Sequence, residues 1–199
     1  MDKEKRVIKV ILLGESGVGK TNLINVSIGL NFNESVSATL SNNFVEKIFT
    51  INHKNYYLHL WDTIGQERFR LLTKIFFKNS KIVILVYDKS KRESFEELKY
   101  WNNEVNEALD EEFVTGVVGN KEDLDDNKDD VNEDEGREYA KSINARFRMV
   151  SAKLNPNGFQ SFLKELLIDY IDKSKNGVPD RKSFLLGEKE ATRKKSKSC

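Results

Sequence analysis

Apolar residues are arranged in two kinds of segment along this chain. Short apolar runs of strand type lie at residues 7–14, 44–51, 56–62, 82–88, 113–120 and 146–151. Between most of them the apolar residues repeat every three or four positions, which indicates helices with one buried face. One such stripe consists of Phe95, Leu98, Trp101 (or Asn102), Val105 and Leu109, and a second of Phe159, Phe162, Leu163, Leu166, Leu167 and Tyr170. Strands that alternate with helices predict an α/β domain.

The strand-type runs also predict how the sheet is built. The run at 82–87 is apolar on both of its faces, as in parallel strands that helices cover on each side. The connection at 52–55 is too short for a crossover helix, so the two strands that flank it must be antiparallel. We therefore expect a three-layer α/β domain, with a six-stranded mixed sheet, one antiparallel edge strand and helices on both faces.

Composition limits the kind of protein that this sequence can encode. The chain has 199 residues, of which 38% are hydrophobic and 33% charged, and this suits one soluble domain. Its net charge of +1 gives no global field that would attract nucleic acid, so we expect no nucleic-acid partner. No apolar run approaches the about 18 residues of a membrane span, and the start MDKEKR lacks the apolar segment of a secretory signal. With Cys199 as its one cysteine, the chain is expected in the cytosol.

The last part of the sequence differs in composition from the rest. The apolar periodicity stops near residue 172, and residues 173–199 contain nine Lys/Arg and three Asp/Glu. This segment therefore carries a formal charge of +6, and the part before it carries −5. We expect one domain over residues 1–172 and a flexible basic tail over residues 173–199.

A glycine-rich segment follows the first apolar run. Residues 14–21 read GESGVGKT and match the phosphate-binding pattern G-x-x-x-x-G-K-[ST] in full, between a predicted strand and a predicted helix. Glycines let the backbone wrap so that its N–H groups point at an anion, beside the start of a helix. Lys20 would reach the β- and γ-phosphates, and the Thr21 hydroxyl would bind Mg²⁺. The residues predicted to surround the phosphates are Gly14, Ser16, Gly17, Val18, Gly19, Lys20, Thr21 and Asn22.

A second polar segment, WDTIGQE at residues 61–67, ends the third strand-type run. Asp62 would lie at the sheet edge that faces the phosphate loop, where a carboxylate can hold Mg²⁺ through water. Gly65 can present its N–H to the γ-phosphate, and Gln66 can orient an attacking water as the catalytic residue. This short motif is weak alone, but its position after a complete phosphate loop favours a functional role.

Two further segments decide which base is bound. Asn120, Lys121 and Asp123 belong to the sequence NKED that follows an apolar strand. A carboxylate at Asp123 can accept hydrogen bonds from both the ring N–H and the exocyclic amine of guanine. Adenine has no donors on that edge and would leave the carboxylate unpaired, which argues against an ATPase or kinase. The segment Ser151, Ala152 and Lys153 ends the next strand and would bring a backbone N–H near the guanine O6. The predicted nucleotide is GTP.

The acidic stretch after NKED has one alternative interpretation. Asp123, Asp125 and Asn127 occupy positions 1, 3 and 5 of a calcium-loop pattern. Lys128 and Asp134 replace the glycine and glutamate of that pattern, so a solvated loop is favoured. We expect the loop to lead into a helix with Asn132 as its N-cap.

With these residues in place, residues 7–171 resemble the small GTPases of the Ras superfamily, and the Rab branch in particular. The Rab-like segments are YLHLWDTIGQERFR (57–70), VYDKSKRESFEELKYW (86–101), GNKEDL (119–124) and SAK (151–153). The resemblance implies the P-loop GTPase fold, binding of GTP/GDP and Mg²⁺, slow hydrolysis and control of vesicle traffic from the cytosolic face of an endomembrane. It also implies an exchange factor, a GTPase-activating protein, effectors and a dissociation inhibitor or escort protein as partners.

The resemblance assigns roles to five further positions. Phe32 matches the aromatic residue that packs against guanine, and Thr39 matches the threonine that reaches Mg²⁺ when the γ-phosphate is present. Phe44, Trp61 and Phe76 match the aromatic trio on which Rab effectors dock.

The sequence departs from the Rab pattern in several places. It has LSNNF at 40–44 where IGVDF is usual, so effector identity does not transfer. Ile64 stands where alanine is usual, which leaves open a nucleotide-binding module with little turnover. FFKNS at 76–80 replaces a YYRGA-like stretch, and one final cysteine replaces the usual pair. We expect a single isoprenoid on Cys199, with the basic residues Arg193, Lys194, Lys195 and Lys197 as a second membrane signal.

Overall fold

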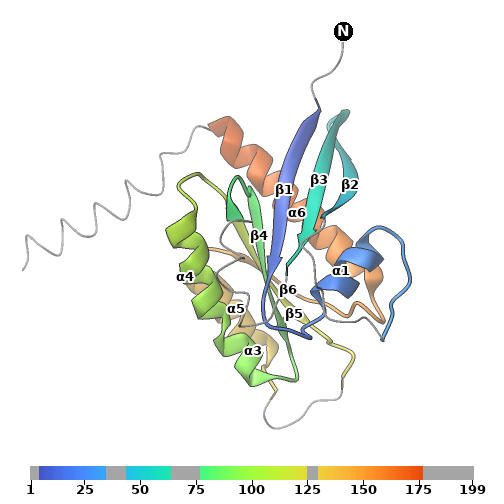
Figure 1. The fold of residues 1–199 in the computed structure, drawn as a ribbon, viewed down its shortest axis with the longest axis vertical. Coiled ribbons are helices and arrows are strands. Elements are labelled where there is room, and N and C mark those ends of the chain that lie inside the picture. Colours follow the sequence, from blue (N-terminus) through green and yellow to red (C-terminus); the bar gives the residue numbers. More distant parts are fainter. Residues whose placement is uncertain (1–4, 35–43, 64–76, 125–129, 177–199) are drawn as a thin grey trace, which may run out of the picture.

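One mixed sheet organises the molecule. The structure, a computed structural model, describes residues 5–34, 44–63, 77–124 and 130–176 (Figure 1). Within these residues six strands pair in the order β2-β3-β1-β4-β5-β6. Their bounds are Arg6–Leu13 (β1), Phe44–Ile51 (β2), Lys54–Asp62 (β3), Ile82–Asp88 (β4), Val114–Asn120 (β5) and Arg146–Met149 (β6). Only the β2–β3 pair is antiparallel among the pairs of this sheet. The predicted six-stranded mixed sheet with an antiparallel edge strand is confirmed.

Helices cover both faces of this sheet. The helices are α1 (Lys20–Ser27), α3 (Arg92–Glu96), α4 (Leu98–Ala108), α5 (Glu133–Ser142) and α6 (Pro156–Asn176). Figure 1 shows α3, α4 and α5 on one side of the strands and α1 and α6 on the other. In the described part of the chain no helix is long and apolar enough to cross a membrane.

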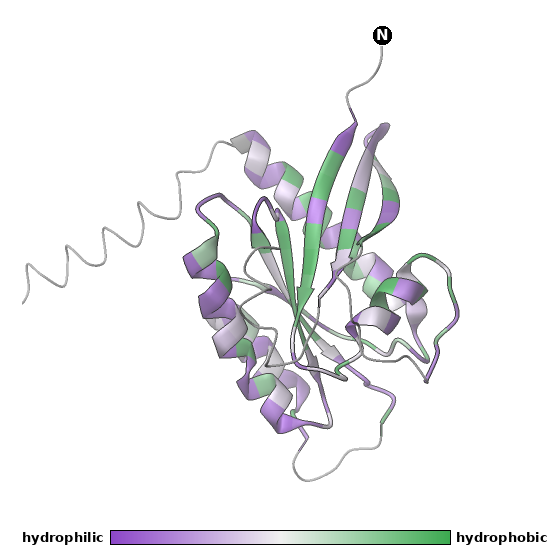
Figure 2. Cartoon of the chain, in the orientation of Figure 1, coloured by the Kyte–Doolittle hydropathy of each residue, from purple (hydrophilic) through white to green (hydrophobic). Residues whose placement is uncertain are grey.

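The strands supply alternate residues to two hydrophobic clusters, one on each face. On β1, Ile8, Val10 and Leu12 pack with residues of α1 and α6, whereas Ile11 and Leu13 pack with residues of α4 and α5. This alternation arises because successive side chains of a strand point to opposite faces. Figure 2 accordingly shows hydrophobic colouring along the central strands and mixed colouring on the helices around them.

The predicted helical stripes lie in these clusters. Phe159, Phe162, Leu163, Leu166 and Leu167 of α6 are all 0% exposed. Of the two alternatives for the α4 stripe, Trp101 is buried, at 1% exposure, and Asn102 is half-buried. The side chain of Asn132 accepts the N–H of Glu135 in a capping box that begins α5, which confirms the predicted N-cap.

Some predicted strand boundaries were wrong by one or two residues. β1 ends at Leu13, because Gly14, with φ of 148°, already turns into the glycine-rich loop. β6 ends at Met149 instead of residue 151, and the Ser151 side chain bonds the neighbouring loop. The parallel arrangement of β1, β3, β4, β5 and β6 brings the polar segments after these strands to one edge of the sheet.

Candidate functional site

The glycine-rich loop joins β1 to α1 at this edge. Gly14, Gly17 and Gly19 all have positive φ, of 148°, 80° and 98°. A Cβ on Gly14 would lie 2.0 Å from the carbonyl oxygen of Val86, and one on Gly19 would lie 2.4 Å from Nδ2 of Asn120. Both positions therefore require glycine for space as well as for conformation. Gly19 is the N-cap of α1, so the amides of the first helical turn and the positive end of the helix dipole face this loop.

Lys20 lies inside the loop. Its side chain is buried, and its Nζ donates to the carbonyl oxygens of Gly14 at 2.8 Å and Glu15 at 2.9 Å. Burial lowers the pKa of Lys20 to about 8, against the opposing effects of Asp62 and Glu15. A bound phosphate would supply the negative charge that favours the protonated amine.

Two oxygen atoms meet beside Lys20, in the arrangement that suits Mg²⁺. The Thr21 hydroxyl, in the first turn of α1, donates to Oδ2 of Asp62 at the end of β3, at 2.7 Å. Hydroxyl and carboxylate oxygens are the hard ligands that Mg²⁺ takes from proteins. The next residue, Thr63, donates its buried hydroxyl to the carbonyl of Leu12 and so anchors the chain beyond Asp62. These residues fit a magnesium ion.

Asn120 connects three of the loops at this edge. Its Nδ2 donates to the carbonyl of Val18 in the phosphate loop at 2.8 Å, and its Oδ1 accepts the N–H of Ala152 at 3.3 Å. Asn120 is 2% exposed. Because both hydrogen bonds are buried, its replacement would leave polar groups of two other loops unpaired.

Asp123 and Ser151 lie in contact. The Ser151 hydroxyl donates to Oδ1 of Asp123 at 2.5 Å and accepts the backbone N–H groups of Lys153 and Leu154 at 3.2 and 2.9 Å. The Asp123 side chain is half-buried, whereas the side chain of its neighbour Glu122 is exposed. Ser151 thus fixes the direction of the Asp123 carboxylate.

The loop that contains Phe32 is held against the same edge. The Asn22 side chain donates to the carbonyl of Asn33 at 2.9 Å and accepts its N–H at 3.2 Å. Lys153 Nζ lies 2.9 Å from Glu34 Oε1, and Phe32 packs against the hydrophobic cluster of α1 and α6. The predicted neighbours of the purine, Phe32 and Lys153, therefore belong to segments that contact each other.

Sequence reasoning missed an ion pair in the NKED segment. Lys121 has φ of 66°, and its Nζ lies 2.7 Å from Oδ2 of Asp88 at the end of β4. A left-handed backbone costs a non-glycine residue about 1–2 kcal/mol, so contacts around Lys121 must hold it there. The signal in the sequence was a carboxylate that directly closes the buried run of residues 82–87.

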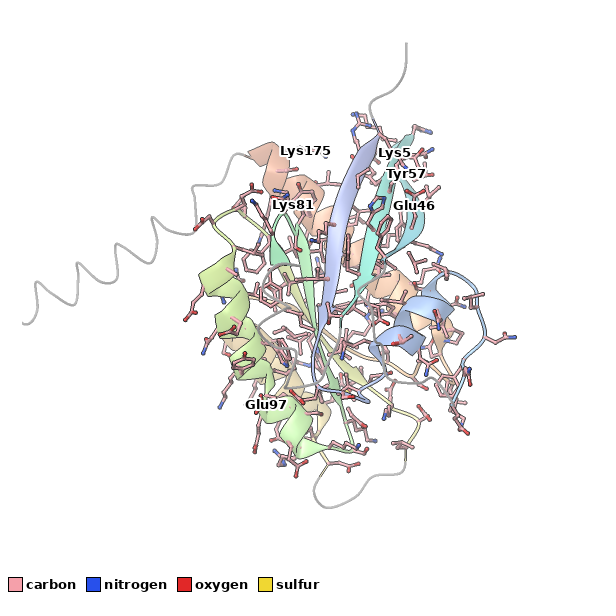
Figure 3. The ribbon with its side chains drawn as sticks, viewed as in Figure 1. Lys5, Glu46, Tyr57, Lys81, Glu97 and Lys175 are labelled. Carbon is pink, nitrogen blue, oxygen red and sulfur yellow. The ribbon has the colours of Figure 1, made fainter. Side chains whose placement is uncertain are left out.

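Several predicted positions lie outside the described residues: Thr39, Ile64, Gly65, Gln66, Phe76 and Cys199. Of the predicted aromatic trio, Phe44 and Trp61 lie together, with ring centroids 5.2 Å apart and Phe44 46% exposed. Phe44 also stacks on His59, with centroids 4.3 Å apart. Further along the β2–β3 pair, Lys5 Nζ lies 2.7 Å from Glu46 Oε2 and 4.4 Å from the centroid of the Tyr57 ring (Figure 3).

The sequence of this chain is similar to those of known proteins. The Ras family model matches residues 9–170. Ras-related protein Rab-21 of Geodia cydonium is 39% identical over 155 residues, which cover 78% of this chain and 67% of that protein. Ras-related protein SEC4 of Saccharomyces cerevisiae is 37% identical over 171 residues, which cover 85% and 79%. Ras-related protein Rab-21 of Homo sapiens is 38% identical over 161 residues, which cover 81% and 69%.

Proposed function

The chain belongs to the Ras family of small GTPases, in its Rab-like branch, and we propose that the site described above drives a GTP-operated switch in vesicle traffic. The observation that carries this proposal is that four separate segments meet at one sheet edge through Asn120, Asp123 and the Thr21–Asp62 pair. The chain is a GTPase, as its family membership indicates.

Base recognition, in this proposal, depends on Asp123. Its carboxylate accepts the ring N–H and the exocyclic amine of guanine, while Ser151 holds it in place. A backbone N–H of the segment Ser151, Ala152 and Lys153 would serve the guanine O6. Phe32 and Lys153 flank the ring from two segments that the Glu34–Lys153 ion pair joins.

Phosphate binding depends on the amides after Gly14 and on Lys20. The loop encloses the phosphates, and Lys20 exchanges its two carbonyl partners for phosphate oxygens. Thr21, Asp62 and, from the sequence, Thr39 would hold Mg²⁺, which neutralises phosphate charge when it is bound. Gly65 and Gln66 are the residues that we assign, from the sequence alone, to the γ-phosphate and to the attacking water.

Switching follows from the residues that contact the γ-phosphate. Thr39 and Gly65 would engage GTP and lose that contact after hydrolysis, which changes the surface that effectors read. Proteins of this family work with regulators and effectors. For this chain we propose an exchange factor, a GTPase-activating protein, effectors at Phe44, Trp61 and Phe76, and a dissociation inhibitor or escort protein.

Membrane attachment is a separate part of the proposal. Residues 173–199 are basic and contain Cys199, and an isoprenoid there would act together with the Lys/Arg residues at an anionic leaflet. The protein would then work as a peripheral protein on the cytosolic face of an endomembrane.

The test is nucleotide binding followed by single-turnover hydrolysis. Purified protein should bind GDP and GTP with Mg²⁺ and should bind ATP far more weakly. Bound GTP should then convert to GDP at a slow but measurable rate. If the protein binds GTP but does not hydrolyse it, either alone or with an activating protein, it is instead the nucleotide-binding module with little turnover that Ile64 suggested.

A further inference from the structure

The base-binding loop, residues 120–124, contacts a buried carboxylate that none of the nucleotide motifs includes. Asp88 is the last residue of β4, and the strand register pairs it with Asn120, the residue at which the loop begins. Its side chain is 1% exposed. Burial of an ionised carboxylate is unfavourable unless nearby groups pair with it, so the contacts of Asp88 determine what it does.

The two oxygen atoms of Asp88 face different partners. Oδ1 accepts the backbone N–H of Ser90 at 3.0 Å and its hydroxyl at 2.8 Å. Oδ2 lies 2.7 Å from Nζ of Lys121. The turn after β4 therefore fixes the carboxylate, and the carboxylate presents its second oxygen to the base-binding loop.

Lys121 is the residue of that loop with an unfavourable backbone conformation. Its φ of 66° is left-handed, a conformation that persists in a lysine only when surrounding contacts determine it. The residue after Asp88 adds two such contacts, because the N–H of Lys89 donates to the Asn120 carbonyl at 3.0 Å and its Nζ to the Leu124 carbonyl at 3.1 Å. Residues 88 and 89, at the end of β4, thus hold the loop at Asn120, Lys121 and Leu124.

We propose that Asp88 is a positioning residue of the base-binding loop, which acts through Lys121 to set how long a bound guanine nucleotide is retained. The inference rests on the proposed function, since it concerns the same site. Asp123 is held independently by Ser151. Asp88 therefore governs retention of the nucleotide and leaves the choice of base unchanged.

The experiment measures release of a fluorescent GDP analogue from the full chain. Asp88→Asn keeps the size of the side chain and the oxygen that Ser90 contacts, but it removes the charge that pairs with Lys121. Release should become about 10- to 100-fold faster, the loss expected for one hydrogen-bonded charge pair. Lys121→Met should give a similar acceleration, and Asp88→Asn should add less than about twofold in that background because the pair is already broken.

Two further readouts separate positioning from general support of the fold. The ratio of GDP to xanthosine diphosphate affinity and the single-turnover rate of prebound GTP should both stay within about twofold of wild type. The control variant is Glu111→Gln, which breaks the ion pair with Lys81 at the opposite end of β4 and should not change release (Figure 3).

Three results would overturn the inference. The first is release of the GDP analogue from Asp88→Asn at the wild-type rate. The second is that Asp88→Asn accelerates release as much in the Lys121→Met background as in the wild-type background. A parallel loss of base preference and hydrolysis would show that Asp88 supports the fold instead. If the wild-type chain binds no guanine nucleotide, the proposed function itself fails, and that result is distinct from the other three.

Discussion

Asp123→Asn should reverse the polarity of the base pocket, because the surrounding hydrogen bonds determine which way the new amide points. The Ser151 hydroxyl accepts backbone N–H groups of Lys153 and Leu154 at 3.2 and 2.9 Å. Its one proton is therefore donated to Oδ1 of Asp123, 2.5 Å away. In the variant the amide oxygen keeps this bond with Ser151, so the NH₂ group replaces the oxygen that we assign to guanine.

The size of the effect follows from the two hydrogen bonds that guanine would lose. A hydrogen bond to a charged group contributes about 1.5–3 kcal/mol. Loss of both is worth about 3–6 kcal/mol, and 1.4 kcal/mol is tenfold in affinity, so GTP should bind roughly 10²- to 10⁴-fold more weakly. Xanthine has a carbonyl in place of the exocyclic amine and can accept from the new NH₂ group, so xanthine nucleotides should gain relative to guanine nucleotides.

The assay is competition of GTP and xanthosine triphosphate against a fluorescent GDP analogue. Glu122→Gln is the matched control, since it removes one charge from the same loop at an exposed side chain and should leave GTP affinity unchanged. A GTP affinity of Asp123→Asn within about twofold of wild type would refute the assignment of the base pocket.

Three other predictions concern the phosphates, the reaction and the membrane. Burial lowers the pKa of Lys20 to about 8 and a bound phosphate should raise it, so GDP affinity should be constant below that pH and fall as the pH rises above it. A titration from pH 7 to pH 9.5 checks this, and a flat profile would contradict it. Gln66→Leu should leave GTP binding intact and lower single-turnover hydrolysis, which should be about 10⁻⁴ s⁻¹ unaided in wild type. An unchanged rate, with and without an activating protein, would favour the binding module. Cys199→Ser should move the protein from the membrane to the soluble fraction of cells, and full retention on membranes would show that attachment comes from a partner protein.

The fold class followed from the sequence because its signals are local. Short apolar runs and the helical spacing of apolar residues can each be recognised within a short segment of the chain, and the short 52–55 connection alone requires an antiparallel pair. The phosphate loop could be recognised for the same reason, since its glycines, Lys20 and Thr21 lie within eight consecutive residues. Some strand ends were predicted wrongly, because a residue such as Ser151 lies beyond the sheet and donates a hydrogen bond to Asp123 in the neighbouring loop.

The contacts between segments were decided by the tertiary structure. Asp88 contacts Lys121 only because β4 pairs with β5 in this register. The sequence of neither strand indicates which strand will be its neighbour. The same holds for the Glu34–Lys153 ion pair, whose partners are far apart in sequence. The sequence by itself therefore determined which groups can bind a nucleotide and a magnesium ion. The packing of the sheet decided which of those groups support one another, because long-range contacts depend on strand order and not on local periodicity.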